Sequence, residues 1–562
     1  MQGQGAYILM LATILAGMAA CGGTGGRLEP FAPGSVKVGG EIGRRMEVTL
    51  EKMLRHTDIE NTFTRHFRVR KACPDEPGGF AGYGMFLDAL VKAAAHGVGG
   101  EETVRAKTRL LRELGGLQTP DGRISMFSGE PGFWDNHEAA YMIQALCRDH
   151  RWFGTTNSLA TARKLADSLI ALKSCTTIGM ESAFLLLYQE TGERKYLEWM
   201  ERECAIAVDI DTFDRQLKVL GVRHVYTWLA RSLAQLEYAD AVNAPPAERA
   251  KLAAAAEEAF RRTRGDYLSI TGSLTGTPAW GEVWDATQTG TGKWGETCAT
   301  AYLMRLSAKA MEKNAASELG DLIERALYNA FFSAQSSDGL KYRYWTPFNE
   351  RAPWYDRDTY CCPNNYKREV FELPDMVFLR RRDGLAVNLY SDAELQAEGV
   401  RATMRTAYPA DGKVALEVCM QGRVLDLRIP GWCDGATVAV DGGAPQSATK
   451  GWYRLERDFT SPVKIAIDLP MAIRLVPGTK AQQGRVAVMR GPCVYALALG
   501  ESSPEWLVDC WDLDDSQPLV WNAARQTVDA TFRRNVQPQT RTLSLTRYCA
   551  DVHDRTYFDL VR

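Results

Sequence analysis

The stretch Gly84-Met85-Phe86-Leu87-Asp88-Ala89-Leu90-Val91-Lys92-Ala93 decides how the larger part of this chain folds. Its apolar residues recur with the period of an α-helix, and similar amphipathic runs follow one another from residue 101 to residue 334. The segments between these runs carry Gly, Pro and Asp, which are typical of loops. About a dozen helices in antiparallel pairs fit an (α/α)6 toroid, so we predict one over residues 41–375, with its pocket at the end where the loops gather.

Beyond residue 376 the pattern changes to that of β-strands. Residues 413–418, 424–429 and 463–469 alternate apolar and polar side chains, and turn sequences such as Asp441-Gly442-Gly443 separate such runs. We therefore predict a β-sandwich over residues 376–480 and a second sandwich segment over residues 481–562. The fold class is multidomain α+β, as expected for 562 residues, because a single core stops growing near ~250–300 residues.

The N-terminus has the composition of a targeting segment. Residues 7–20 are mostly apolar, small residues precede Cys21, and a glycine-rich run follows it, as in a bacterial lipoprotein signal. The apolar run is shorter than the ~20 residues that cross a bilayer. We expect a signal over residues 1–21, lipid attachment at Cys21, a linker over residues 22–40, and export to the periplasm or cell surface. The alternative is an ordinary cleaved signal peptide in which Cys21 has no role.

The net charge limits the kinds of binding partner that we expect, and the cysteine pattern bears on disulfides. A formal charge of -2 without a cluster of Lys and Arg argues against nucleic acid or an acidic membrane surface as the main partner. Membrane contact is expected only through the lipid anchor. The thirteen cysteines show no disulfide framework, and those lying singly in apolar helical context behave as small hydrophobes.

Two fragments concentrate metal-ligating residue types. Cys361 and Cys362 are adjacent and are followed by Pro363, whereas Glu296 and Cys298 lie one residue apart before an apolar helical run. Neighbouring side chains of extended backbone point to opposite faces, so a core strand seldom needs both cysteines. Together the four residues form a set that selects Zn²⁺. Without the metal, the adjacent cysteines would be able to form a strained vicinal disulfide.

A zinc ion with four protein ligands usually has a structural role. This helical domain has ample core, however, and needs no metal to fold. Its ligands fall near loops of the expected toroid mouth and close to 280–282 and 342–347, where aromatic residues are mixed with polar ones. Such a mixture suits a sugar ring, whose faces are apolar and whose edge needs hydrogen bonds.

Six stretches occur in the order in which one known family carries them: 271–282, 295–299, 324–329, 344–347, 361–365 and 484–492. Together they resemble the β-L-arabinofuranosidase family, glycoside hydrolase family 127. The specific part is Gly295-Glu296-Thr297-Cys298 combined with Cys361-Cys362-Pro363.

The resemblance implies a retaining glycosidase with a zinc-bound cysteine nucleophile. It makes Cys361 the nucleophile and Glu282 the general acid/base, and it makes Glu296, Cys298, Cys361 and Cys362 the zinc ligands. It also implies that His137, Glu324 and Tyr344 bind the sugar. Each role has a plainer alternative: Glu282 as a loop carboxylate paired with arginine, Glu324 and Tyr344 as a buried hydrogen-bonding pair, and His137 as a histidine satisfied at a helix start.

The sequence departs from the family pattern in the sugar-binding shell. Residues 176–181 stand where a glycine-histidine signature is expected, and Leu220 stands where a histidine is expected. We therefore expect release of L-arabinofuranose, or of a related modified furanose, from the side chains of plant-type oligosaccharides or polysaccharides. One alternative is a glycosidase or lyase that uses other residues of the cleft. Another is a non-catalytic glycan-binding lipoprotein with a structural zinc.

Overall fold

The structure is a computed structural model that describes residues 27–70, 80–129, 132–172, 178–204, 206, 225–242, 245–247, 261, 267–274, 287–355, 357–498, 510–534 and 539–561. The predicted signal segment and Cys21 lie outside these residues. Among the described helices, none is both long enough and apolar enough to cross a bilayer. No disulfide joins any two of the ten cysteines in the described ranges.

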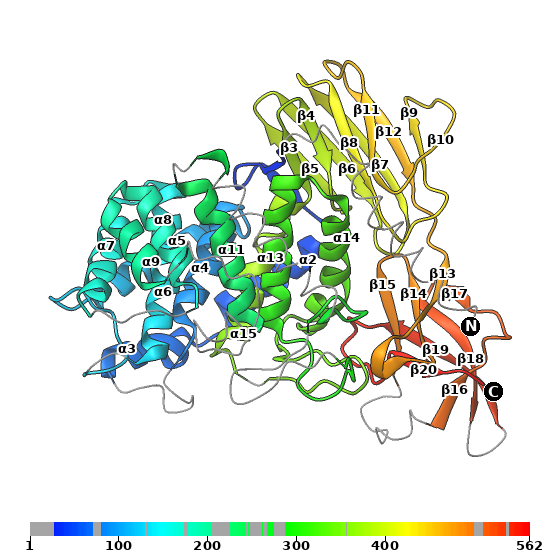
Figure 1. Ribbon diagram of the computed structural model, residues 1–562, viewed down its shortest axis with the longest axis horizontal. Helices are drawn as coiled ribbons and strands as arrows, with labels where there is room; N and C mark the ends of the chain where they lie inside the picture. The colour runs from blue at the N-terminus through cyan, green and yellow to red at the C-terminus, as the bar shows by residue number, and fades with distance from the viewer. Residues whose placement is uncertain are drawn as a thin grey trace.

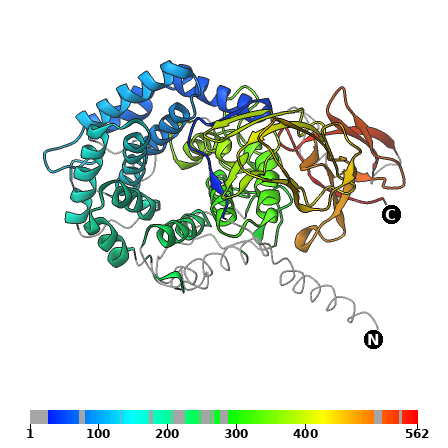
Figure 2. The same ribbon diagram turned by 90° about the horizontal axis from the view of Figure 1, so that it is seen from above.

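Six helices form a closed inner ring, which Figure 2 shows from above. They are α4 (Tyr83–Ala95), α6 (Phe133–Phe153), α8 (Met180–Thr191), α11 (Val225–Ala241), α13 (Thr297–Asn314) and α15 (Cys361–Val370). Each helix contacts the next, and α15 returns to contact α4. The predicted helical toroid is confirmed.

The remaining described helices flank this ring or connect to it. They are α2 (Gly40–Glu51), α3 (Arg65–Val69), α5 (Gly100–Gly116), α7 (Thr156–Ala171), α9 (Arg194–Glu203) and α14 (Ser317–Ala326), with the π-helical turns η1 (Lys52–His56), η2 (Glu60–Thr64) and η4 (Leu327–Phe331) and the 3-10 turn η5 (Leu373–Met376).

Burial patterns explain which helices lie inside the ring. In α4 nearly every residue is buried, including Asp88 and Lys92, as expected of a helix that contacts neighbours on all sides. In α5 the buried residues are Thr103, Lys107, Leu110, Leu111 and Leu114, which form a single stripe with helical spacing. The fully buried α4 therefore belongs to the inner ring, and the amphipathic α5 covers it.

Two sheets stack into a β-sandwich beside the ring, at the upper right of Figure 1. The five-stranded sheet has the order β1 (Glu29–Pro30), β3 (Phe378–Arg381), β4 (Gly384–Val387), β8 (Val424–Ile429) and β11 (Gly451–Glu456). The seven-stranded sheet has the order β10 (Gln446–Ser447), β9 (Thr437–Val440), β12 (Val463–Asp468), β7 (Lys413–Met420), β6 (Val400–Thr406), β5 (Ala393–Ala397) and β2 (Val36–Val38). Alternating burial along β7 and β12 gives each strand one core face and one exposed face.

The expected linker over residues 22–40 is not a linker where the structure describes it. Strand β1 pairs with β3, and β2 pairs with β5, so the segment before the ring completes both sheets of the sandwich. The main-chain groups of these short strands find hydrogen-bond partners at the sheet edges. The N-terminal segment therefore ties the sandwich to the start of α2.

A third sheet of eight strands follows the sandwich, at the lower right of Figure 1. It contains β13 (Ile473–Pro477), β14 (Arg485–Arg490), β15 (Cys493–Leu497), β16 (Trp511–Leu513), β17 (Val520–Asn522), β18 (Thr527–Arg534), β19 (Thr540–Arg547) and β20 (Tyr557–Asp559). Because β13 pairs with β14, this sheet begins before the predicted boundary at residue 481. The Asn329 side chain bonds to the backbone of Pro492 and Val494, which fixes the sheet against η4.

Candidate active site

The structure brings four ligand side chains together at one end of the ring. One ligand atom each from Glu296, Cys298, Cys361 and Cys362 lies within 4.8 Å of all the others, and all four residues are buried. The Sγ atoms of Cys298 and Cys362 are 3.3 Å apart, and the Cys362 Sγ lies 3.6 Å from the Glu296 Oε1. We call these four residues the sulfur cluster. Their geometry allows them to hold a metal ion.

Glu296 and Cys298 are positioned by the start of α13. Glu296 is the residue before the helix and forms a β-bridge with Trp345. The Thr297 N–H donates to the Tyr344 carbonyl at 3.0 Å, which fixes the first turn against that bridge. Gly295 precedes them with φ +66°, and a Cβ there would lie 2.5 Å from the Thr346 Oγ1. The turn into α13 therefore requires glycine at this position.

Cys361 and Cys362 occupy the first turn of α15, and the residue before them has a strained backbone. Tyr360 has φ +81° and ψ 172°, a region that is almost confined to glycine and costs about 1–3 kcal/mol. Its N–H donates to the Ala81 carbonyl at 2.9 Å, and its carbonyl accepts from the Asn364 Nδ2 at 2.8 Å. These bonds maintain the turn that directs both thiols into the cluster.

The electrostatics of the sulfur cluster favour a bound cation. Burial raises the pKa of the Cys298 and Cys362 thiols well above their usual range, and the neighbouring Cys361 adds to the effect in both. Without a cation these thiols are neutral, whereas coordination to a divalent ion favours the thiolates. Three sulfurs and one carboxylate oxygen match the donors that zinc prefers. The side chains present therefore fit a zinc ion.

Accessibility distinguishes Cys361 from the other two thiols. Cys361 keeps 5% of its surface exposed, whereas Cys298 and Cys362 keep none. The Tyr344 hydroxyl lies 3.4 Å from the Cys361 Sγ. Cys298 instead accepts a hydrogen bond from the Asn365 Nδ2 at 3.1 Å, on the buried side. Cys361 is therefore the least buried of the three thiols.

His137 lies among aromatic rings beside the turn that carries Cys361. Its ring centre is 4.7 Å from that of Phe80 and 5.5 Å from that of Trp134. Phe80 and Trp134 in turn contact Tyr360, the residue before Cys361, with ring centres 5.7 and 6.1 Å apart. His137 and Tyr344 are thus both near the sulfur cluster.

Glu324 is hydrogen-bonded to residues of the β-sandwich segment. Its Oε1 accepts from the Arg428 Nη2 at 2.8 Å and from the Tyr408 hydroxyl at 2.6 Å, and its Oε2 accepts from the Trp432 Nε1 at 2.8 Å. All three donors belong to the β-sandwich segment. None of these three hydrogen bonds involves the sulfur cluster, so the structure supports a role for this carboxylate at the interface between α14 and the sandwich.

Several residues singled out from the sequence lie outside the described ranges. They are Glu282 with its neighbour Trp280, Leu220 and the residues 176–177 of the altered signature. Of that signature, residues 178–181 are described, and Glu181 is the charged residue among them. It is buried at the start of α8, with its Oε1 3.7 Å from the Arg231 Nη1.

One supporting residue, Glu138, had no role in our sequence interpretation. Its carboxylate accepts hydrogen bonds from the backbone N–H groups of residues 81–84, at the start of α4. Burial raises the pKa of Glu138 to about 7. Because the same turn accepts the Tyr360 N–H, Glu138 helps to order the backbone before Cys361. The sequence feature that could have revealed Glu138 is a carboxylate directly before the largely apolar run 139–143 of the same helix.

Comparison with known proteins places the chain near one group of enzymes. The family model described as "Beta-L-arabinofuranosidase, GH127 catalytic domain" matches residues 78–375, and the model of the GH127 middle domain matches residues 384–471. A non-reducing end β-L-arabinofuranosidase of Bifidobacterium longum is 25% identical over 471 residues, which cover 70% of each chain.

Two solved structures have a similar fold. The GH127 β-L-arabinofuranosidase of Geobacillus stearothermophilus T6 aligns with a TM-score of 0.74 at 20% identity, covering 94% of this chain and 100% of the other. A second structure, described as a GH127 β-arabinofuranosidase, aligns with a TM-score of 0.78 at 20% identity, covering 96% and 98%. At this identity the likeness shows the fold.

Proposed function

Because the chain belongs to the β-L-arabinofuranosidase family, glycoside hydrolase family 127, we propose that this glycoside hydrolase is a retaining exo-enzyme that releases L-arabinofuranose or a related furanose. The observation that carries the proposal is the sulfur cluster, in which Cys361, at the start of α15, is the least buried thiol. The donors are plant-type oligosaccharides or polysaccharide side chains. The altered residues 176–181 and Leu220 support a modified furanose as an alternative substrate.

The proposed nucleophile is Cys361. A zinc ion held by Glu296, Cys298, Cys361 and Cys362 would keep the Cys361 sulfur as a thiolate near neutral pH, where a free thiol with a pKa near ~8.5 is mostly protonated. The Cys361 Sγ attacks the anomeric carbon and the bond to the leaving oxygen breaks. Glu282 donates its proton to that oxygen in the same step.

Water completes the reaction in a second displacement. Glu282, now a carboxylate, removes a proton from water, whose oxygen attacks the anomeric carbon while the carbon–sulfur bond breaks and Cys361 becomes a thiolate again. Two displacements at the same carbon retain its configuration. Tyr344, 3.4 Å from the Cys361 Sγ, is placed to donate to the sulfur as it leaves. His137, among the aromatic rings beside this turn, and Tyr344 are the residues proposed to bind the sugar.

The cellular location is part of the same proposal. The apolar run before Cys21 supports export, with the chain held at the membrane by a lipid on that cysteine. Glycan side chains outside the cell would then be within reach of the enzyme.

The proposal is tested by replacing the nucleophile. Cys361→Ala should lower release of an aryl β-L-arabinofuranoside by about 10⁴-fold or more, with circular dichroism and the melting temperature showing a folded protein. Cys147→Ala is the matched control, because Cys147 is a buried thiol on α6 outside the cluster and should leave the rate near that of the wild type. A Cys361→Ala enzyme with an unchanged rate would contradict the mechanism. A wild-type protein that binds arabinan without hydrolysing any furanoside would favour the non-catalytic alternative.

A further inference from the structure

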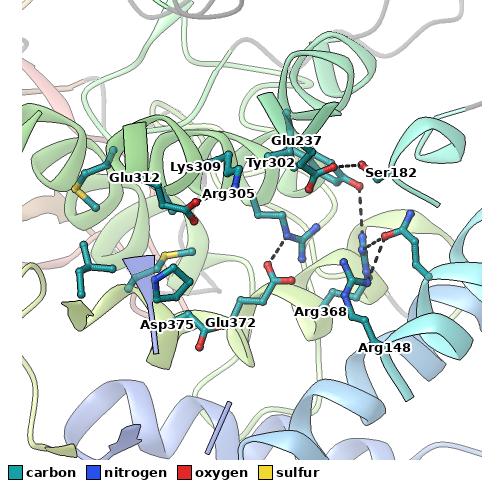
Figure 3. A pocket seen from close by; sticks show the side chains of 17 residues that line it. Arg148, Ser182, Glu237, Tyr302, Arg305, Lys309, Glu312, Arg368, Glu372 and Asp375 are labelled. Carbon is teal, nitrogen blue, oxygen red and sulfur yellow. Dashed lines mark hydrogen bonds and ion pairs between the residues drawn. The ribbon is translucent and has the colours of Figure 1, made fainter. Parts of the chain in front are cut away.

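A second polar cavity lies between later turns of the inner helices, away from the first turns that carry the sulfur cluster. Its volume is about 230 Å³. Figure 3 shows side chains of α6, α11, α13 and α15 converging on it. Pro30 of β1 and Leu379 of β3 also line it. We call it the arginine cavity after Arg148, Arg305 and Arg368, which line it.

Arg305 is the residue that points to a ligand. Its Nε lies 2.6 Å from the Glu372 Oε2 and 2.7 Å from the Glu369 Oε2. Its Nη1 and Nη2 are buried and find no hydrogen-bond acceptor in the part of the chain that the structure describes. The whole residue is only 8% exposed, and Figure 3 shows its guanidinium directed into the cavity. Two parallel N–H groups without an acceptor form a fork that suits a carboxylate or a phosphate.

The charged groups nearest Arg305 include more guanidinium groups than ionised carboxylates, a balance that favours binding of an anion. Arg368 and Arg148 both pair with Asp88, and Arg305 pairs with Glu372, so three guanidinium groups share two ionised carboxylates. Burial raises the pKa of the third carboxyl group, Glu369, to about 8, so it is mostly protonated at neutral pH. Lys92 contacts the same two carboxylates, Asp88 and Glu372, and adds positive charge when it is protonated, although burial lowers the pKa of its ammonium to about 7. Excess positive charge in a buried site is costly unless it is paired.

The rim of the arginine cavity is acidic, which limits what can enter. The Glu312 carboxylate pairs with Lys309 at 2.8 Å, and Asp375 lies 3.6 Å from the His96 Nε2. The Glu237 Oε2 accepts a hydrogen bond from Ser182 at 2.7 Å. A polyanion would be repelled by this rim, whereas a small anion can pass it and reach Arg305.

We propose that the arginine cavity is a binding site for a small oxyanion, a carboxylate or a phosphate, held by the Nη1 and Nη2 of Arg305. The site is separate from the sulfur cluster and does not depend on the proposed hydrolase mechanism. About 230 Å³ accommodates one such small molecule and excludes an oligosaccharide chain.

Titration calorimetry with inorganic phosphate and with acetate, at constant ionic strength in chloride, tests the proposal in the full-length protein. The wild type should bind at least one of them saturably, and the stronger of the two identifies the ligand class. Arg305→Lys keeps the charge but loses the fork, so it should weaken binding about tenfold or more. Arg194→Lys, on the exposed surface of α9, is the matched control and should bind like the wild type.

Glu237→Gln provides a test that a folding defect in the Arg305 variant cannot obscure. Removing a negative charge from the rim should tighten oxyanion binding by roughly threefold or more. The absence of saturable binding in the wild type would overturn the proposal. So would unchanged affinity in Arg305→Lys, or unchanged or weaker affinity in Glu237→Gln.

Discussion

The sulfur cluster and the arginine cavity are both buried polar regions of one helical ring, yet they have opposite electrostatic needs. In the sulfur cluster, burial raises the pKa of Cys298 and Cys362, so the thiols need a cation before they ionise. In the arginine cavity, three guanidinium groups share two ionised carboxylates, and two nitrogens of Arg305 find no hydrogen-bond acceptor among the described residues. The comparison teaches that one polar ring interior offers two kinds of incomplete site, one with side chains that suit a metal ion and one with side chains that suit the proposed oxyanion.

The largest effect that separates the two regions is expected from Glu282→Gln. If Glu282 is the acid/base of the sulfur cluster, the variant should lose about 10²–10⁴-fold in kcat/KM on substrates with poor leaving groups. Phosphate or acetate binding to the arginine cavity should not change. Hydrolysis rates for alkyl and activated aryl glycosides provide the measurement.

Activated aryl glycosides should be cleaved with a smaller defect, because their leaving oxygen needs no proton, and added azide should restore turnover by replacing activated water. Equal activity of Glu282→Gln and wild type on both substrate types would remove Glu282 from the reaction.

The next largest effect concerns Glu324, which belongs to neither region. Glu324→Gln leaves Arg428 with a weakened buried pair, so the free energy of unfolding should fall by about 3 kcal/mol. The KM for the furanoside should stay near the wild-type value. Urea unfolding and steady-state kinetics on the same preparation distinguish the roles, since a sugar-binding carboxylate would raise KM and leave stability nearly unchanged.

The sequence predicted the parts of this comparison that rest on local pattern. Helical periodicity in residues such as Leu87, Leu90 and Val91 predicted the ring, and the alternation along 413–418 predicted the sandwich. The four ligands of the sulfur cluster followed from adjacent cysteines and a carboxylate one residue from a third. These signals are local, and tertiary contacts do not overturn them.

The sequence did not predict features created by distant partners. Strands β1 and β2 are too short to show alternation, and they become strands only because β3 and β5 offer open edges. In the sequence, Arg305 and Glu372 look like ordinary exposed charged residues. They form a largely buried pair only because the closed ring brings them together. Glu324 similarly acquires its role from Arg428, which lies in another part of the chain.

A smaller effect is expected from Glu138→Gln, which tests the support behind the sulfur cluster. The neutral amide cannot accept from all of the backbone N–H groups at the start of α4, so unfolding should become easier by about 1–3 kcal/mol at about pH 5. The wild-type carboxyl group has its pKa raised from 4.5 to about 7 by burial, so its contribution to stability is full below pH 4.5 and is lost as the pH rises to about 7.

The difference between the two proteins should therefore shrink between about pH 5 and pH 7, by at most about 1.4 kcal/mol per pH unit. Urea titrations across this range measure it, with Glu101→Gln on the exposed side of α5 as the control. A difference that stays constant with pH would show that Glu138 is already ionised throughout.

Metal content tests the central claim most directly. Elemental analysis of the purified wild type should find about one zinc per chain, and hydrolysis should fall in proportion as a chelator removes the metal and return when zinc is added. Cys298→Ser should bind far less zinc, whereas Cys147→Ser should match the wild type. A fully active preparation containing far less than one metal ion per chain would contradict the account.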